Sequence, residues 1–245
     1  RAPALQPGTA LFTFEQPSLF VTHYSDAGFA FNILYHYQTE DGSLPYWFFS
    51  RRFHFDYKPD MWFKYQLRGL VFEGNTSDGI AVLHQEGAKC LRVLDQVYTY
   101  DRVLGDGRDV LLAVSNPDRI LADPNAPLPD PEIFGPEPAH NWCYFFEKAD
   151  LARQVKDWQT VLSLYKQAKG QGLAPEYGAE YVPFIEAYAQ TGEWQKAYDM
   201  TLQAQDLTHE LSRMLCANWL RFGQDPSADM KVINQLKRSL SCSKY

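Results

Sequence analysis

The stretch DPNAPLPDPEIFGPEP at residues 123–138 determines how the rest of the sequence is divided. It contains six prolines, each of which lacks a backbone N–H donor and pushes the residue before it toward extended geometry. We therefore expect neither a helix nor a central strand here, but a stiff connector. The residue pattern changes across this connector, which predicts an N-terminal domain at residues 1–122 and a second domain at residues 139–245.

Residues 139–245 show helical periodicity. Six segments of helix length alternate with short breaks: Cys143–Gln154, Trp158–Lys169, Ala179–Gln190, Trp194–Ala204, His209–Phe222 and Ala228–Leu240. A spacing of 36 residues relates Asp157-Trp158-Gln159 to Glu193-Trp194-Gln195. Paired helices that recur at a fixed spacing are typical of repeat proteins. The sequence thus predicts an all-α domain built from helical hairpins.

This repeat resembles a degenerate tetratricopeptide repeat, whose unit has about 34 residues. The resemblance rests on Ala149 in the first helix, on the Gly192-Glu193 turn before an aromatic residue, and on Pro175 at the close of the first unit. In tetratricopeptide arrays the first helix of each pair lines the concave surface. The resemblance therefore implies that five polar residues face a peptide partner: Asp150, Arg153, Gln154, Glu186 and Gln190. An ordinary polar helix face is the alternative explanation.

Residues 1–122 mix segments of strand length with one of helix length. A strand is expected at Ala10–Glu15 and an aromatic-rich helix at Ser25–Gln38. Six further apolar runs are expected to be strands, and the third to fifth of them suggest a meander: Pro45–Phe53, Met61–Leu67, Gly69–Glu73, Ile80–Gln85, Lys89–Asp95 and Val110–Ser115. We infer an α/β or α+β domain with a mixed sheet.

The overall charge and hydropathy exclude two classes of function. The 245 residues carry 23 Lys and Arg against 30 Asp and Glu, a formal charge of −7. This balance argues against nonspecific binding of nucleic acid, because neutralising phosphates needs a basic surface. No apolar run reaches the roughly 18–20 residues that a membrane-spanning helix needs, so none of these residues is expected to cross a bilayer.

The four cysteines, at positions 90, 143, 216 and 242, show no Cys-x-x-Cys pair and no histidine at metal-ligand spacing. This spacing argues against a zinc site and against a thioredoxin-type dithiol. We expect isolated thiols that pack as small apolar groups, with a single disulfide as the alternative. No metal and no cofactor is expected from these residues.

Aromatic residues are concentrated in the N-terminal domain, and most are expected to form its core. A second interpretation concerns two tryptophans and their basic neighbours, namely Trp47 and Trp62 with Arg51 and Arg52. Amphipathic rings beside cationic side chains suit an interface with lipid headgroups. The same residue types also form stacking platforms for sugars, so these four residues are candidate binding residues.

Catalytic candidates are few. Ligands of open α/β sheets bind beyond the carboxyl ends of the strands, so Glu15, His23 and Asp26, which follow the first predicted strand, are the candidates for acid–base chemistry. A solvated loop explains the same three residues. The sequence contains no Gly-x-Ser-x-Gly, P-loop or Gly-x-Gly-x-x-Gly motif, so it indicates no defined reaction.

Two stretches carry a broader resemblance. The first comprises residues 1–9 (RAPALQPGT), and the second comprises residues 134–153, which run from FGPEP into WCYFFEKADLAR. Together they resemble the soluble C-terminal region of large bacterial membrane proteins. In that class, a multi-helix membrane portion similar to glycosyltransferases that use polyprenyl-phosphate sugars precedes the soluble region. The resemblance implies an extracytoplasmic domain tethered just before Arg1. It implies no active site here, because that chemistry would lie in the membrane portion.

One leading hypothesis and two alternatives follow. The leading hypothesis is a non-catalytic accessory domain on the extracytoplasmic side of a membrane, which binds a glycan, a lipid headgroup or a partner protein. The first alternative is a soluble tetratricopeptide scaffold that binds a peptide, and the alternative location is the cytoplasm. The second is a hydrolase or transferase centred on Glu15, His23 and Asp26.

Overall fold

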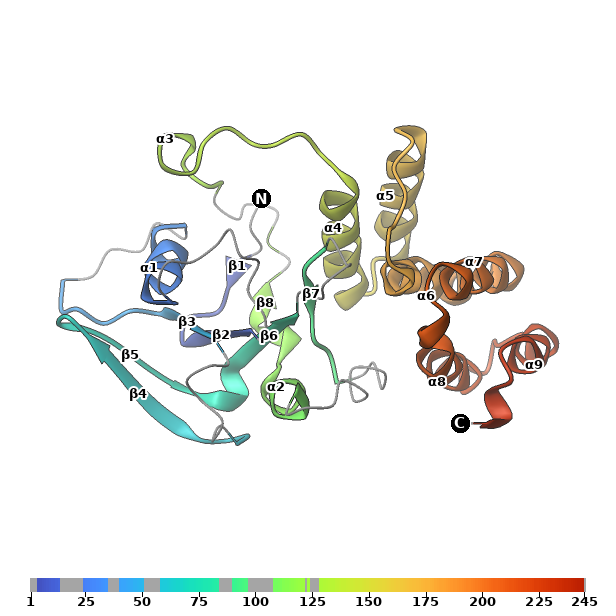
Figure 1. Ribbon diagram of the computed structural model, residues 1–245, viewed down its shortest axis with the longest axis horizontal. Helices are drawn as coiled ribbons and strands as arrows, with labels where there is room; N and C mark the ends of the chain where they lie inside the picture. The colour runs from blue at the N-terminus through green and yellow to red at the C-terminus, as the bar shows by residue number, and fades with distance from the viewer. Residues whose placement is uncertain are drawn as a thin grey trace. The chain divides into compact units, whose positions relative to one another are not determined.

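The computed structural model describes residues 4–13, 24–34, 40–50, 58–83, 90–96, 108–121, 123 and 128–244 (Figure 1). These residues form two compact units. The first unit contains the strands and helices α1–α3, and the described part of the predicted connector belongs to it. The second unit contains helices α4–α9. It also contains Cys90 and Leu91, although these two residues precede the connector in the sequence.

The main sheet of the first unit has β2 (Thr9–Thr13) at its centre. The strands β3 (Tyr46–Ser50) and β6 (Gly79–Leu83) pair with β2 in parallel, and β7 (Arg92–Val93) pairs with β6 antiparallel. Two neighbouring parallel strands need a crossover connection. Helix α1 (Tyr24–Leu34) lies between β2 and β3 in the chain and packs against β3. The predicted mixed sheet is therefore present.

Side chains of the main sheet alternate between two apolar clusters, as the pleat of a strand requires. Phe12, Trp47 and Phe49 point into the larger cluster. Leu11 and Phe48 point into the smaller cluster on the other face. Since both faces are covered, the strands can be apolar along their whole length, which explains the uninterrupted aromatic sequence of β3.

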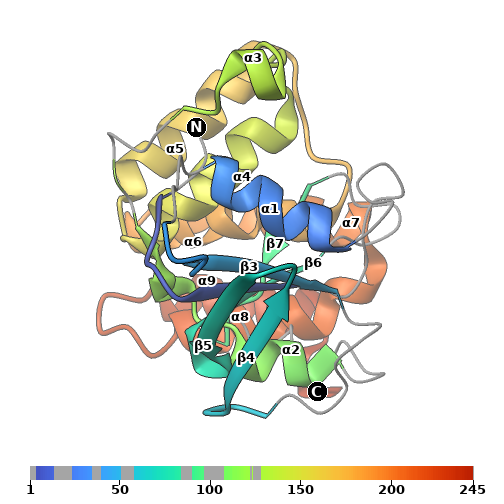
Figure 2. The same cartoon turned by 90° about the vertical axis from the view of Figure 1, so that its left-hand side faces the viewer.

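The strands β4 (Trp62–Leu67) and β5 (Leu70–Asn75) form a separate antiparallel hairpin (Figure 2). Arg68 and Gly69 connect them, and both have positive φ, 51° and 84°, as a two-residue turn of the I′ type requires. The predicted meander is wrong at its first pairing, because β5 pairs with β4 and not with β6. β6 joins the main sheet instead.

Residues 110–115, expected to be a strand, belong mainly to helix α2 (Arg108–Val114). A short apolar run has the same appearance in a buried strand and in a buried helix. The Leu-Leu-Ala sequence in this run favours the helix, and Leu112 and Val114 bury their side chains in the larger apolar cluster.

Helix α3 (Pro131–Phe134) is a single turn inside the stretch where no helix was expected. Asp130 caps it by accepting a hydrogen bond from the backbone N–H of Glu132 at 2.9 Å. Pro131 stands in the first turn, where its missing N–H costs nothing. Gly135, with φ of 78°, ends the turn. The prolines limit the length of a helix here without preventing it.

Two short strands complete the described part of the first unit. β1 (Ala4–Leu5) and β8 (Ile120–Leu121) pair antiparallel. Next to them, the guanidinium of Arg119 donates to Thr9 Oγ1 and to Asp78 Oδ1, each at 3.2 Å. These contacts join the beginning and the end of the first unit.

All six segments predicted to be helical after the connector are helical. The helices are α4 (Trp142–Gln154), α5 (Trp158–Gly170), α6 (Val182–Gln190), α7 (Trp194–Leu207), α8 (Ser212–Phe222) and α9 (Met230–Ser239). Short 3-10 turns at Gly178–Tyr181 and His209–Leu211 occupy the expected starts of α6 and α8. Asn141 caps the first of these helices, because its Oδ1 atom accepts a hydrogen bond from the backbone N–H of Tyr144 at 3.1 Å.

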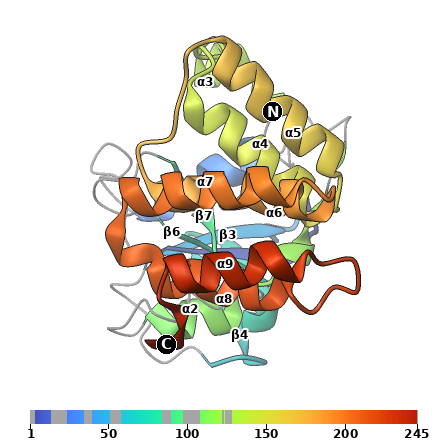
Figure 3. The same ribbon diagram turned by 90° about the vertical axis from the view of Figure 1, so that its right-hand side faces the viewer.

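Helices that are adjacent in the chain pack together, α4 on α5 and α6 on α7. Figure 3 shows α7 and α9 running side by side, and a hydrogen bond of 3.0 Å between Tyr198 Oη and Ser239 Oγ joins them. One continuous apolar core fills the unit. At Gly178 a Cβ would lie 2.1 Å from the carbonyl oxygen of Ala204, so only glycine permits this close approach of the chain to α7.

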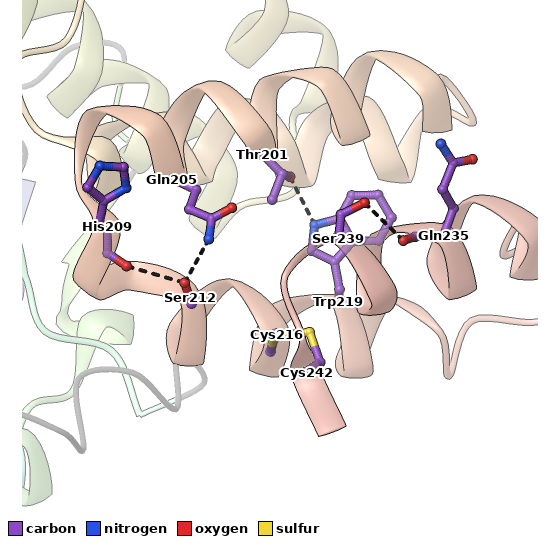
Figure 4. The surroundings of a disulfide bond; sticks show 9 residues. All are labelled: Thr201, Gln205, His209, Ser212, Cys216, Trp219, Gln235, Ser239 and Cys242. Atoms are coloured by element: carbon purple, nitrogen blue, oxygen red, sulfur yellow. Dashed lines mark hydrogen bonds between the residues drawn. A yellow bond between two sulfur atoms is a disulfide. The ribbon is translucent and has the colours of Figure 1, made fainter. Parts of the chain in front are cut away.

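The prediction of isolated thiols is wrong, because all four cysteines are paired. Cys90 bonds to Cys143 in the first turn of α4, and Cys216 on α8 bonds to Cys242 (Figure 4). The Cα–Cα distances are 5.0 and 5.5 Å, within the range of native disulfides. The partners are 53 and 26 residues apart, a spacing that contains no local signal for the pairing.

Among the described residues, no helix combines the length and the apolar character that crossing a bilayer requires.

Candidate functional site

A network of charged side chains connects three helices of the second unit. On α4, Arg153 Nε lies 2.7 Å from Asp150 Oδ1. Arg153 Nη1 also lies 4.0 Å from Glu186 Oε2 on α6, an ion pair too long for a hydrogen bond. The other oxygen of Glu186 accepts a hydrogen bond of 2.9 Å from Arg221 Nη1 on α8. These four residues, called here the ionic network, join α4, α6 and α8 directly.

The centre of the ionic network is buried and its ends reach solvent. The side chains of Arg153 and Glu186 are each 6% exposed, whereas those of Asp150 and Arg221 are 17% and 32% exposed. Placing opposite charges together in a protein interior compensates part of the cost of removing them from water. The central pair therefore has a structural role first, and only the two end residues can contact another molecule.

Small residues allow the helices to approach closely enough for these contacts. Ala149 and Ala152 on α4, and Ala187 and Ala189 on α6, are buried beside the charged positions. The network also follows the repeat spacing, because Asp150 and Glu186 are 36 residues apart.

The structure brings three of the five predicted partner-facing residues together, namely Asp150, Arg153 and Glu186. Gln190 is exposed at the end of α6 and lies outside the network. Gln154 is half-buried, and its Oε1 atom has no hydrogen-bond partner among the described residues. Arg221 was not anticipated from the sequence, although it lies one position before the residue that the repeat spacing relates to Glu186.

A second polar group of this unit lies deep in its core. Glu180, in the turn before α6, is 0% exposed. Burial raises the pKa of its carboxyl. Four neighbouring groups lower the same pKa by a smaller amount, namely the Trp142 indole and the backbone N–H groups of Glu176, Cys90 and Tyr177. Neither Trp142 Nε1 nor Glu180 Oε1 has a partner at hydrogen-bond geometry among the described residues, so the indole acts through a longer contact.

Glu180 and the Cys90–Cys143 disulfide together hold the Cys90 segment to the helical unit. The carboxyl of Glu180 interacts with the backbone of Cys90, and the disulfide attaches the same residue to α4. On the next turn of α4, loss of hydration raises the pKa of Glu147 to about 7, and the carboxylates of Asp150 and Glu180 add to the rise.

The predicted aromatic binding residues of the first unit are separated by the fold. Trp47 is 1% exposed, and its ring packs edge-to-face on Phe29 at 5.6 Å and against Tyr65 at 4.9 Å. Trp47 is therefore a core residue, which corrects its assignment to an exposed platform. Trp62, on the outer face of β4, is 74% exposed. Arg51 and Arg52 lie outside the described residues.

The side chains of the three catalytic candidates lie outside the part of the chain that the structure describes. Glu15 and His23 lie outside the described residues, and Asp26 lies in α1, where only its backbone is described. The parallel strands β2, β3 and β6 do end at one edge of the sheet, since Thr13 pairs with Ser50 on one side and with Val82 on the other. In the described part of the chain, no cluster of three or more His, Cys, Asp or Glu side chains could hold a metal ion.

Comparison with protein-family models, with curated proteins and with solved structures gives no match to this chain.

Proposed function

We propose that this chain is a non-catalytic extracytoplasmic domain that binds a partner protein through helices α4, α6 and α8, in the manner of a tetratricopeptide array. The ionic network carries the proposal. Contacts from Arg153 to Glu186 and from Glu186 to Arg221 connect the first helices of three successive pairs. First helices that stand side by side in this way form one continuous face, which is the surface that binds peptides in tetratricopeptide proteins.

The pairing of all four cysteines supports the extracytoplasmic assignment. Disulfides persist in oxidising compartments, whereas thiols in the cytosol are kept reduced. Both disulfides of this chain lie in the helical unit, so its stability depends on an oxidising environment. The attachment of this domain to a membrane portion similar to a glycosyltransferase is part of the same proposal.

The groups at the edge of this face define the kind of partner that fits it. Asp150 and Arg221 present opposite charges that are partly exposed. Gln190, one turn after Glu186 on α6, adds an exposed amide. A polar partner segment without a large net charge complements these groups.

The proposed surface can be tested by site-specific photo-crosslinking in cells that produce the full-length protein. A photoreactive residue replaces Gln190 on α6 in one variant and the exposed Gln203 on α7 in the control. We expect a discrete protein adduct from position 190 and none from position 203. Equal adducts at both positions, or none at position 190, would contradict binding through the first helices.

The compartment can be tested independently. The protein is isolated with alkylation of free thiols before lysis, and the four cysteines are examined by mass spectrometry. We expect all four to be protected and the Cys90–Cys143 and Cys216–Cys242 pairs to be recovered. Four alkylated cysteines in protein taken from its native host would place the domain in a reducing compartment.

A further inference from the structure

Trp62 differs from every other tryptophan of the chain. All six tryptophans lie among the described residues, and five of them are buried or half-buried: Trp47, Trp142, Trp158, Trp194 and Trp219. Trp62 is 74% exposed. No ring contact and no hydrogen bond of its indole occurs in the described part of the protein. An indole normally buries its large apolar surface, so a tryptophan left open to water on a regular strand requires an explanation.

The backbone beneath Trp62 is held firmly at the base of the β4–β5 hairpin. Asn75, which pairs with Trp62 across the hairpin, donates from Nδ2 to Asp60 Oδ1 at 2.9 Å. The backbone N–H of Met61 donates to Thr76 Oγ1 at 3.0 Å, and the N–H of Thr76 donates to the Met61 carbonyl oxygen at 3.0 Å. The indole therefore projects from a fixed base and not from a loop tip.

The two faces of the hairpin have opposite character. Phe63 and Tyr65 point inward and pack against the ring of Phe49. The outward positions of β4 are exposed. Two residues from Trp62, Lys64 Nζ lies 2.6 Å from Glu73 Oε1 in an ion pair that is more than half exposed. The outer face thus presents one open aromatic ring beside a pair of charges that cancel.

We propose that Trp62 is a stacking platform for a neutral pyranose ring. One face of a pyranose carries mainly C–H groups, which stack on an aromatic surface, while its hydroxyl groups can bond to the amine of Lys64 and the carboxylate of Glu73. An anionic lipid headgroup fits this face less well, because the charge of Lys64 is compensated by Glu73. This site goes beyond the proposed protein binding and lies in the other unit, so failure of one proposal leaves the other standing.

Fluorescence quenching tests the proposal directly, because acrylamide quenches the exposed indole much more efficiently than buried ones. The probes are chitotetraose, maltotetraose and mannotetraose, which are neutral pyranose oligomers. We expect at least one of them to protect part of the emission from acrylamide. In the Trp62→Ala variant we expect binding to that oligomer, measured by titration calorimetry, to weaken at least tenfold, with a smaller loss in Trp62→Phe, which keeps a ring.

Trp158→Phe is the matched control, since it removes a tryptophan from the helical unit and should leave binding unchanged. Circular dichroism verifies that Trp62→Ala is folded, which is expected because the side chain is not packed. The proposal is overturned if none of the three oligomers protects the emission, or if Trp62→Ala binds as tightly as the unaltered protein. Protection by vesicles containing phosphatidylglycerol, without protection by any oligomer, would overturn it in favour of a lipid-headgroup site.

Discussion

At the scale of single residues, Glu186 shows that a side chain expected at the surface from the sequence can be buried in the structure. It belongs to a polar helix pattern, yet its side chain is 6% exposed and lies between two arginines. Without Glu186, Arg153 would keep Asp150 as an acidic partner, but Arg221 Nη1 would lose a charged hydrogen-bond acceptor, and the loss of such a bond costs about 1–3 kcal/mol. The residue is therefore more important for stability than its residue type suggests.

We expect Glu186→Ala to lower the free energy of unfolding by about 1–3 kcal/mol, because Arg221 Nη1 loses its charged acceptor and Arg153 loses its ion pair with α6 while keeping Asp150. Urea unfolding followed by tryptophan fluorescence measures the change. Glu193→Ala is the control: its carboxylate pairs with Lys196 at the surface, so we expect little effect. Equal losses in the two variants would show that the ionic network adds no stability of its own.

The raised pKa of Glu180 predicts how the free energy of unfolding changes with pH. Burial raises the pKa of its carboxyl in the folded state, so the folded protein binds more protons than the unfolded chain above the unfolded value of about 4.3. The free energy of unfolding should therefore fall as the pH rises from that value through the folded-state pKa.

Urea unfolding at several pH values between about 4.5 and 7.5 checks this prediction. We expect Glu180→Gln to show a shallower decline with pH than the unaltered protein. Glu147, whose pKa burial raises to about 7, contributes with the same sign, so Glu147→Gln separates the two residues. A slope that Glu180→Gln leaves unchanged would mean that this carboxyl keeps its ordinary pKa in the folded protein.

At the scale of helices and strands, local signals determined where most elements begin and end. Asn141 satisfies an N–H that the first turn of α4 leaves without a partner, and Gly69 supplies the positive φ that the hairpin turn needs. Residues 110–115 had no such signal, and they form a helix where a strand was expected. Capping and turn residues are thus more informative about this chain than apolar content.

We expect Asn141→Ala to destabilise the helical unit by about 1 kcal/mol, because the N–H of Tyr144 loses its acceptor. Asn141→Asp keeps an acceptor oxygen and should retain most of the stability. Thermal unfolding followed by circular dichroism at 222 nm compares the two variants. If Asn141→Asp were as unstable as Asn141→Ala, the side chain would not be acting as a cap.

At the scale of the whole molecule, the two units differ in how they are stabilised. The first unit has apolar clusters on both faces of its main sheet and no disulfide among its described residues. The second unit has one large core and both disulfides. Closing a loop with a disulfide restricts the unfolded chain and typically adds about 2–4 kcal/mol of stability. Reducing conditions should therefore affect the two units unequally.

We expect reduction of both disulfides to lower hydrogen-exchange protection of α6 and α8 much more than that of β2. Exchange measured by mass spectrometry in the presence and absence of a phosphine reductant resolves the two regions. The Cys216→Ser/Cys242→Ser variant, which keeps the Cys90–Cys143 bond, should show a loss concentrated in α8 and α9. Equal loss of protection in β2 and α6 would contradict an independent effect on the helical unit.

The sequence by itself determined the change from a sheet-containing region to a helical one, the six helices after the connector, and the cap at Asn141, because periodicity, proline content and capping are properties of neighbouring residues. Only the tertiary structure decided which tryptophan is buried and which is open. Trp47 and Trp62 stand in similar aromatic strands, but β3 is covered on both faces and β4 on one. The pairing of Cys90 with Cys143, and of Glu186 with Arg221, was likewise decided by packing, since these partners are distant in sequence and meet only when the helices assemble.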